Sequence, residues 1–145
     1  MRWVFSGWQV WAVLSACFAA LTAIFGKIGI ENIDSNFATL IRTVVILLIA
    51  FIVVCATGAY QPVESISRRT YFFLGLSGLA TGASWLCYFR ALKLGPASGV
   101  APIDKLSVVL VALFAVAFIG ERLSARNWLG VVLVALGAIL TAARA

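Results

Sequence analysis

Five long runs of hydrophobic residues alternate with short polar stretches along the chain. We place these runs at about residues 8–26, 36–57, 71–92, 98–119 and 128–144. A helix needs about 20 mostly apolar residues to cross roughly 30 Å of hydrocarbon, and each run approaches that length. The intervening stretches carry charges and helix-ending residues, such as the Gly95-Pro96 pair. The pattern predicts five transmembrane helices in a single domain, residues 1–145.

Composition supports the bilayer as the solvent of this chain. Hydrophobic residues make up 63% of the sequence and charged residues 11%, whereas soluble domains are roughly half apolar. The formal net charge is +6, but most basic residues flank the runs, where they anchor helices in lipid headgroups. We therefore expect no nucleic-acid partner. The prediction is an all-α, multi-pass protein of the cell (inner) membrane, with aromatic residues at the interfaces: Trp3, Trp8, Tyr71 and Trp128.

The residues that most enzymes and metal sites need are missing from the sequence. There is no histidine, and the three cysteines lie singly inside apolar runs, without metal-type spacing. No hydrolase, metalloprotease or phosphate-loop motif is present. We therefore expect no enzyme activity, no catalytic residue, no metal and no cofactor.

The positive charges give no clear membrane orientation. An odd number of spans places the termini on opposite sides, and the basic residues divide almost evenly between the two sides. Because Lys and Arg loop charges set orientation, such a chain could insert both ways and form an antiparallel homodimer. Two inverted halves are how many transporters achieve alternating access. The alternative is a single orientation set by other features.

Asp104 and Lys105 are two adjacent charges inside the fourth run. Ionisable groups in hydrocarbon are costly and usually face a bundle interior or an aqueous pathway. Neighbours in a helix point about 100° apart, so we expect each charge to find its partner on another helix or another copy of the chain. A carboxylate there could exchange protons for a cation, and the lysine could hold an anionic group. Structural ion pairing is the alternative role.

The depth of this pair depends on where the fourth helix begins. If the helix begins at Pro102, Asp104 lies in its first turn and stabilises the helix dipole near the headgroups. If it begins at Pro96, Asp104 lies about 12 Å deep, close to the midplane, where a discontinuous helix can line a transport cavity. The sequence leaves both alternatives open.

The third run offers small polar and aromatic side chains at helical intervals. This stripe could line a pocket that binds an organic solute by stacking, although a packing seam beside the Gly78-xxx-Gly82 pair is the alternative. Arg42 in the second run could extend to the headgroups or pair with an acid at position 31, 34 or 104. The predicted substrate and ion site comprises Asp104, Lys105, Arg42, Thr81, Ser84, Trp85 and Tyr88.

Several segments together resemble the EamA domain of the drug/metabolite transporter superfamily. They are residues 11–16, 26–30, 91–101, the Gly120-Glu121-Arg122-Leu123-Ser124 segment and the Gly-rich run that starts at Trp128. Typical members have ten spans, formed from two such domains in inverted orientation, and export metabolites or amino acids. The resemblance implies that this chain corresponds to one half of that inverted-repeat fold. Residues 91–101 and 120–123 also resemble the four-span small multidrug resistance proteins.

The sequence departs from the small multidrug resistance proteins in one respect that bears on the transport mechanism. Small multidrug resistance proteins carry a glutamate in the first span that binds proton and cation in turn, but residues 8–26 contain no acid. The coupling of transport to protons would then depend on Asp104 or another group. We expect a transporter that exports a small organic metabolite or amino-acid-like solute by alternating access in a homodimer. The alternative is a non-transporting membrane subunit that packs with a larger carrier or enzyme.

Overall fold

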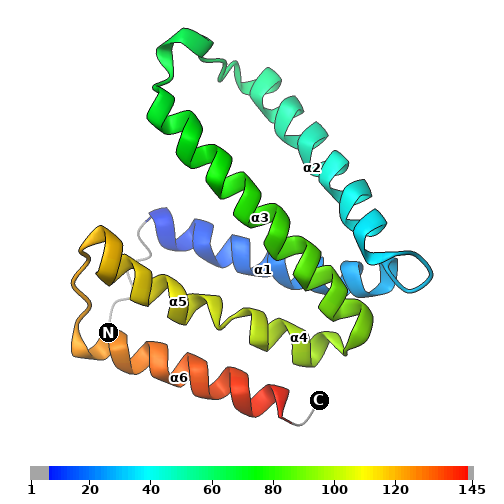
Figure 1. The fold of residues 1–145 in the computed structure, drawn as a ribbon, viewed down its shortest axis with the longest axis vertical. Coiled ribbons are helices and arrows are strands. Elements are labelled where there is room, and N and C mark those ends of the chain that lie inside the picture. Colours follow the sequence, from blue (N-terminus) through cyan, green and yellow to red (C-terminus); the bar gives the residue numbers. More distant parts are fainter. Residues whose placement is uncertain (1–6, 144–145) are drawn as a thin grey trace. The chain divides into compact units, whose positions relative to one another are not determined.

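The computed structural model describes residues 7–143, and every regular element in that range is helical. In chain order these elements are α1 (Gly7–Gly29), α2 (Ser35–Thr57), the short 3₁₀ helix η1 (Val63–Ser65), α3 (Arg68–Leu94), α4 (Ala97–Asp104), α5 (Ser107–Phe114), the π-helical turn η2 (Ala115–Ile119) and α6 (Ala125–Ala142). Figure 1 labels the six α-helices. Residue 144, the expected end of the last span, lies outside the described residues, as do Arg2 and Trp3.

Five helical segments are long and apolar enough to cross a membrane. They cover residues 7–29, 35–57, 68–94, 97–119 and 125–142, and the fourth is made of α4, α5 and η2 in succession. Their 18 to 27 residues correspond to about 27–40 Å of helix, which matches the hydrocarbon thickness. The all-α, five-span prediction is therefore confirmed.

Local chemistry sets several helix ends. The Asp34 carboxylate caps α2, because its Oδ1 accepts hydrogen bonds from the backbone N–H groups of Asn36 (2.8 Å) and Phe37 (3.3 Å). Helix α2 ends at Gly58, and the fourth span ends at Gly120. Both glycines have positive φ, 64° and 76°, a conformation that other residues adopt at a steric cost. These caps separate the spans with short polar turns.

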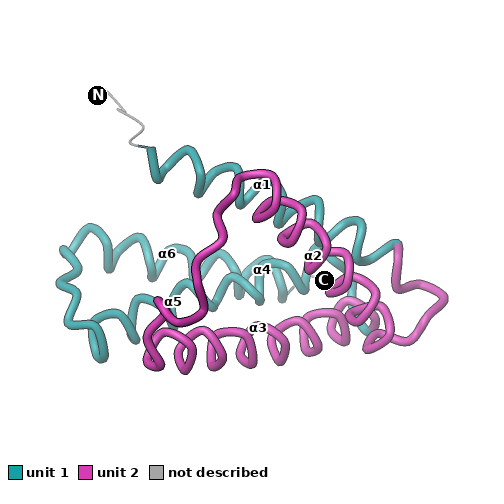
Figure 2. Tube along the Cα trace, turned by 90° about the horizontal axis from the view of Figure 1, so that it is seen from above, with its two compact units in different colours: residues 1–28, 94–145 teal, residues 29–93 magenta. Residues whose placement is uncertain are grey.

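The chain divides into two compact units, coloured separately in Figure 2: residues 1–28 with 94–145, and residues 29–93. In the first unit, α6 runs antiparallel to α4 and α5 and packs against both. The Lys27 ammonium donates a 2.8 Å hydrogen bond to the Gly95 carbonyl, which ties the end of α1 to the turn before α4. The single-domain interpretation of the chain stays a prediction.

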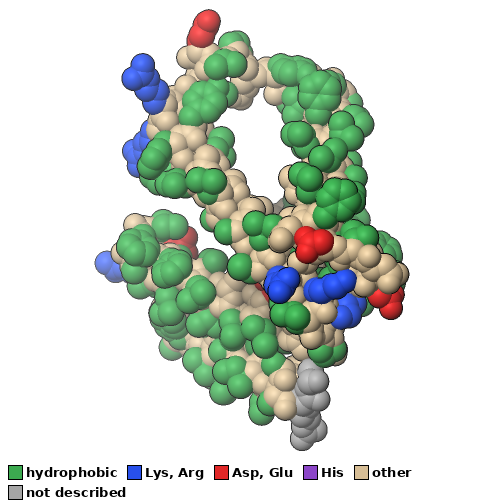
Figure 3. All heavy atoms as spheres, turned by 45° about the vertical axis from the view of Figure 1, so that its right-hand side comes forward, with side chains coloured by type: hydrophobic (Ala, Val, Ile, Leu, Met, Phe, Trp, Pro, Cys, Tyr) green, Lys and Arg blue, Asp and Glu red, His purple; other side chains and the backbone are tan. Residues whose placement is uncertain are grey.

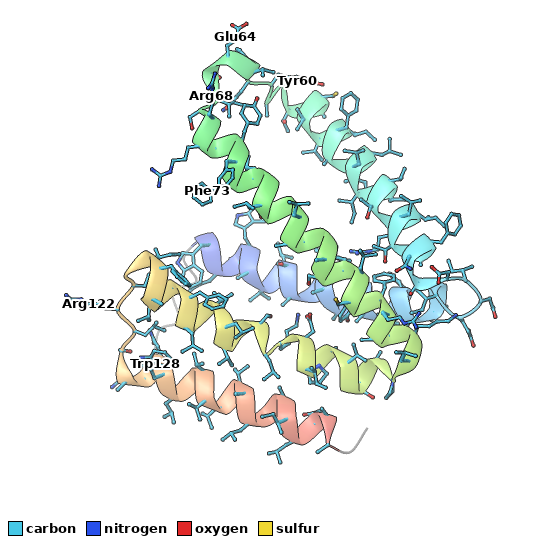
Figure 4. All side chains as sticks on the ribbon, in the orientation of Figure 1. Tyr60, Glu64, Arg68, Phe73, Arg122 and Trp128 are labelled. Atoms are coloured by element: carbon cyan, nitrogen blue, oxygen red, sulfur yellow. The ribbon has the colours of Figure 1, made fainter. Side chains whose placement is uncertain are left out.

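The second unit is a hairpin of α2 and α3, joined by residues 58–67. Its buried side chains gather where α2 begins and α3 ends: Ile30, Ser35, Ala38, Thr39, Phe89 and Leu92. Between this packed end and the connecting turn the two helices diverge. Figure 3 shows the resulting opening, bordered by hydrophobic side chains. Tyr60, Glu64 and Arg68 lie at the turn (Figure 4).

One lysine holds the packed end of this hairpin together. The Lys93 ammonium donates hydrogen bonds to the backbone carbonyls of Ile30 (2.7 Å), Glu31 (2.9 Å) and Ile33 (3.0 Å). An ammonium has three N–H donors, and all three are used here. Lys93 therefore fastens the loop before α2 to the last turn of α3.

Lys93→Met should loosen the packed end of the hairpin, because three loop carbonyls lose a charged donor. Hydrogen bonds to charged groups contribute about 1.5–3 kcal/mol each when buried, and this site is partly exposed, so we expect a total loss of about 1–2 kcal/mol. The measurement is the free energy of unfolding in bicelles. Arg90→Met on the same helix is the matched control, since Arg90 makes no recorded hydrogen bond or ion pair within residues 29–93. Equal losses in the two variants would contradict this role of Lys93.

Candidate functional site

The fourth span is interrupted at the Asp104-Lys105 pair. Asp104 is the last residue of α4, a turn occupies positions 105 and 106, and α5 begins at Ser107. Helix α4 is capped by Pro96, and Pro102 lies inside it. Of the two alternatives for the start of the fourth helix, the structure therefore has the one at Pro96. Asp104 is the eighth residue of α4, about 10 Å along the span from Ala97.

The interruption changes the backbone hydrogen bonds around Asp104. The N–H of Leu106 donates to Ile103 O (2.9 Å), that of Val108 to Lys105 O (3.0 Å) and that of Val109 to Leu106 O (3.0 Å). These are i to i+3 bonds of the 3₁₀ type. In a continuous α-helix the Val108 N–H would bond to the carbonyl of Asp104. The break therefore takes that α-helical donor away from the Asp104 carbonyl oxygen.

Asp104 and Lys105 pair with each other, so the expectation that each needs a partner from another helix was wrong. The Lys105 Nζ lies 3.2 Å from Asp104 Oδ2. The long lysine side chain bends back to the neighbouring carboxylate directly, although the backbone at Lys105 stays right-handed. Side-chain exposure is 35% for Asp104 and 55% for Lys105, so the pair remains open to a ligand.

The second half of the predicted site lies in the hairpin of α2 and α3. Arg42 is the eighth residue of α2, about 10 Å along the span from Ser35. Its guanidinium carbon lies 2.8 Å from the centre of the Trp85 indole and 5.2 Å from the centre of the Phe89 ring. The two rings are stacked, with centres 6.1 Å apart and planes inclined by 28°. We refer to Arg42, Trp85 and Phe89 as the arginine stack.

Within residues 29–93 the structure does not give Arg42 an acidic partner. Extension to the headgroups and pairing with an acid at position 31, 34 or 104 were the alternatives, and neither Glu31 nor Asp34 forms an ion pair with Arg42. Asp34 instead caps α2. A cation over an indole face is attracted by the ring quadrupole, and this contact takes the place of the expected salt bridge.

The other predicted lining residues stand along α3. Thr81 is exposed, and its hydroxyl donates to the Ser77 carbonyl of its own helix (2.8 Å). Ser84 is exposed, and Tyr88 is half-buried, with its ring 6.3 Å from that of Phe89. The structure therefore brings Arg42 to Trp85 and Asp104 to Lys105, while the binding roles of all seven residues stay predictions.

Sequence reasoning missed two contributors, Phe89 and Lys93. Phe89 lies four residues after Trp85, a spacing that places both on one helix face, so the pattern could have revealed it. In the sequence, Lys93 is one of several basic residues near the end of a span. Its hydrogen bonds to three loop carbonyls depend on the fold of residues 30–33, and no local sequence pattern predicts them.

The two groups, each described within its own unit, differ in their chemistry. The pair at the helix break presents one carboxylate and one ammonium with zero net charge. The arginine stack presents a planar cation, whose N–H groups lie in one plane and suit carboxylate or phosphate oxygens. Both groups lie inside helices that are long and apolar enough to span the membrane, and their role in binding stays a prediction. The architecture is that of a multi-pass membrane protein with charged sites within its spans.

Comparison with known proteins identifies the family. The sequence profile of the EamA-like transporter family matches residues 6–143, which is nearly the whole chain. The chain therefore belongs to the EamA-like transporter family and is a membrane transporter of the drug/metabolite type. This confirms the resemblance noted in the sequence and favours transport over enzyme activity.

Individual relatives are named as transporters too. The "Uncharacterized transporter in cobO 3′region" of Sinorhizobium sp is 63% identical over 135 residues, which cover 93% of this chain and 96% of the relative. The "Uncharacterized transporter YxxF" of Bacillus subtilis is 30% identical over 138 residues, 93% of this chain but 42% of the relative. A probable 4-amino-4-deoxy-L-arabinose-phosphoundecaprenol flippase subunit, ArnE of Yersinia pestis, is 32% identical over 80 residues, 55% of this chain and 70% of the relative. No solved structure matches the chain.

A double-mutant cycle tests the Asp104–Lys105 pair. Asp104→Asn and Lys105→Met should each lower the free energy of unfolding, because each leaves an unpaired charge inside a span. The double variant should lose less than the sum of the two. Partly exposed pairs contribute up to about 1 kcal/mol, so we expect a coupling energy of about 0.5–1 kcal/mol, measured in bicelles.

The matched control cycle combines Lys105→Met with Glu121→Gln. These two residues belong to the same unit and form no ion pair within its described residues. This cycle should be additive. Additive losses for Asp104 and Lys105 as well would mean that their contact contributes nothing to stability.

Proposed function

We propose that this chain exports a small organic metabolite or amino-acid-like solute across the cell inner membrane, by alternating access in a homodimer. The observation that carries the proposal is the interruption of the fourth span at Asp104-Lys105. Non-helical backbone at membrane depth is tolerated where it is buried in protein or lines a water-filled cavity. Many transporters use such discontinuous helices to bind substrate and coupling ion near the midplane.

The charges at the break support a role in binding. Ionisable residues inside spans are costly and commonly mark substrate or ion pathways. Asp104 is the one acid of the chain that lies well inside a span, so it is our candidate for the coupling proton or cation. Lys105 would then hold an anionic group of the solute when the pair separates. Two copies would bring two aspartates and two lysines, a balance that suits a neutral or zwitterionic solute.

The size of one relative supports a two-copy assembly. The chain covers 42% of the Bacillus subtilis relative but 96% of the Sinorhizobium relative, so transporter-named proteins exist at both sizes. Two copies of a five-span chain would provide ten spans. A partner could pack on α3, where a Cβ added at Gly75, Gly78 or Gly82 meets nothing within 4 Å. Small residues let helix backbones approach closely in membranes.

A second candidate is a role as a membrane subunit beside a different chain. The observation that favours it is the name of the ArnE relatives, which describes a flippase subunit. Under this alternative, purified protein alone would move no solute in vesicles and a partner protein would co-purify with it. Solute flux by the purified chain alone would exclude it.

Purified protein in vesicles loaded with a pH-sensitive dye should move protons when an effective solute is added. The solutes to screen are amino acids and small organic acids. Asp104→Asn should reduce this proton movement at least about tenfold, because an amide cannot carry the proton. Glu64→Gln, at the exposed turn between α2 and α3, is the control and should keep wild-type flux. Undiminished proton flux in Asp104→Asn would remove Asp104 from the coupling step.

Membrane orientation can be read from single cysteines placed at each terminus, in a background that lacks Cys17, Cys55 and Cys87. The near-balance of flanking charges leads us to expect that an impermeant thiol reagent labels about half of each terminus from either side. This result would support an antiparallel homodimer. Labelling of each terminus from one side only would exclude that arrangement.

A further inference from the structure

We infer that the arginine stack is an oxyanion-binding site, and that the transported solute carries a carboxylate or phosphate group that binds Arg42. This inference rests on the proposed transport function and specifies the class of substrate. The guanidinium lies over the Trp85 indole, 2.8 Å from its centre. Its N–H groups radiate in the plane of the guanidinium, so stacking occupies one face and leaves the donating edge available.

The acids of the hairpin, residues 29–93, do not account for the counter-charge of Arg42. The sequence has five acidic residues. Within residues 29–93 none of Glu31, Asp34 and Glu64 pairs with Arg42, and the Asp34 carboxylate is engaged in capping α2. Ionisable groups inside a span are usually paired. The hairpin gives Arg42 aromatic contacts but no carboxylate, so a bound ligand would supply the anion.

The rings give the guanidinium a fixed place. A long arginine near a helix end can extend towards the headgroups. Here the side chain instead lies over Trp85 and near Phe89, and Phe89 is itself buried, with 3% of its surface exposed. Stacking on the half-buried indole restricts the rotation of the guanidinium and thereby lowers the entropic cost of binding an anion. A planar fork held in this way suits the bidentate geometry of carboxylate and phosphate.

The stack is also accessible. Arg42 and Trp85 are each half-buried, so the edge of the guanidinium is not sealed by the hairpin. Beyond the stack, towards the connecting turn, α2 and α3 diverge and leave the opening seen in Figure 3. Thr81 stands one helical turn from Trp85 in that direction, on the same face of α3. A solute could therefore place its anionic group on Arg42 and its remaining part along α3.

The test measures binding rather than transport, in a full-length protein that keeps Trp85 and carries Phe at the other four tryptophans. We expect inorganic phosphate and acetate, titrated at constant ionic strength in a neutral detergent, to change Trp85 fluorescence with saturation. Arg42→Gln should weaken binding at least about tenfold. Arg42→Lys, which keeps the charge but loses the planar fork, should also weaken it severalfold. Arg122→Gln, a cation on the exposed turn after η2, is the matched control and should leave binding unchanged.

Two further measurements complete the test. The first distinguishes a free solute from a lipid headgroup as the source of the anion, and the second checks that a loss of binding does not come from a folding defect. In nanodiscs, a response to free phosphate with neutral lipid supports a solute site, whereas a response only to phosphatidylglycerol would make Arg42 a headgroup anchor and overturn the inference. Thermal stabilisation by phosphate in protein with all five tryptophans, lost in Arg42→Gln, provides an independent readout. No saturable response in either assay would also overturn it. Binding without solute flux would contradict the transport function, and flux unchanged in Arg42→Gln would contradict the inference alone.

Discussion

Lipid hydrocarbon offers no hydrogen bonds, and this constraint governs the whole chain. Each polar group inside the bilayer must find its partner within the protein, so residues 7–143 form helices wherever they are regular. The same demand explains smaller features. Several threonine hydroxyls inside the spans donate to the carbonyl four residues earlier: Thr39, Thr43, Thr57, Thr81 and Thr141. At the ends of helices, Lys27 and Lys93 supply donors to turn carbonyls that no helix can satisfy.

Two departures from this rule are the places where we propose function. At Asp104 the helix gives up α-helical bonds and holds two charges, and at Arg42 a cation rests on aromatic rings in place of a carboxylate. Both lie about 10 Å inside a span, where unsatisfied groups are most costly. A chain whose task was only to pack in the membrane would gain stability from apolar residues at these positions. Their presence is the physical argument for solute binding.

Hydrophobic patterning was sufficient to predict the five spans, because membrane helices must be about 20 apolar residues long. It also revealed the Asp104-Lys105 pair, since charges stand out in an apolar run. It left open where the fourth helix begins, because Pro96 and Pro102 are both acceptable at a first turn. The contact between Asp104 and Lys105 was missed because the angle between neighbours on a helix does not show that a long lysine side chain can bend to the adjacent carboxylate. The partner of Arg42 was missed because ring stacking between two helices leaves no trace in the spacing of charges.

The bonds of Lys93 have a consequence for the arginine stack. They fix the loop of residues 30–33 to the last turn of α3. Arg42 lies nine residues beyond that loop and Trp85 eight residues before Lys93, so the two side chains stand at nearly equal heights above one anchor. The number of residues between this anchor and Arg42 thus sets which side chains meet. One residue inserted within α2 before Arg42 would turn the guanidinium by about 100° about the helix axis and shift it by about 1.5 Å, which would carry it off the indole. The cap of α2 at Asp34 therefore fixes the register of a contact that lies about 10 Å further along the helix.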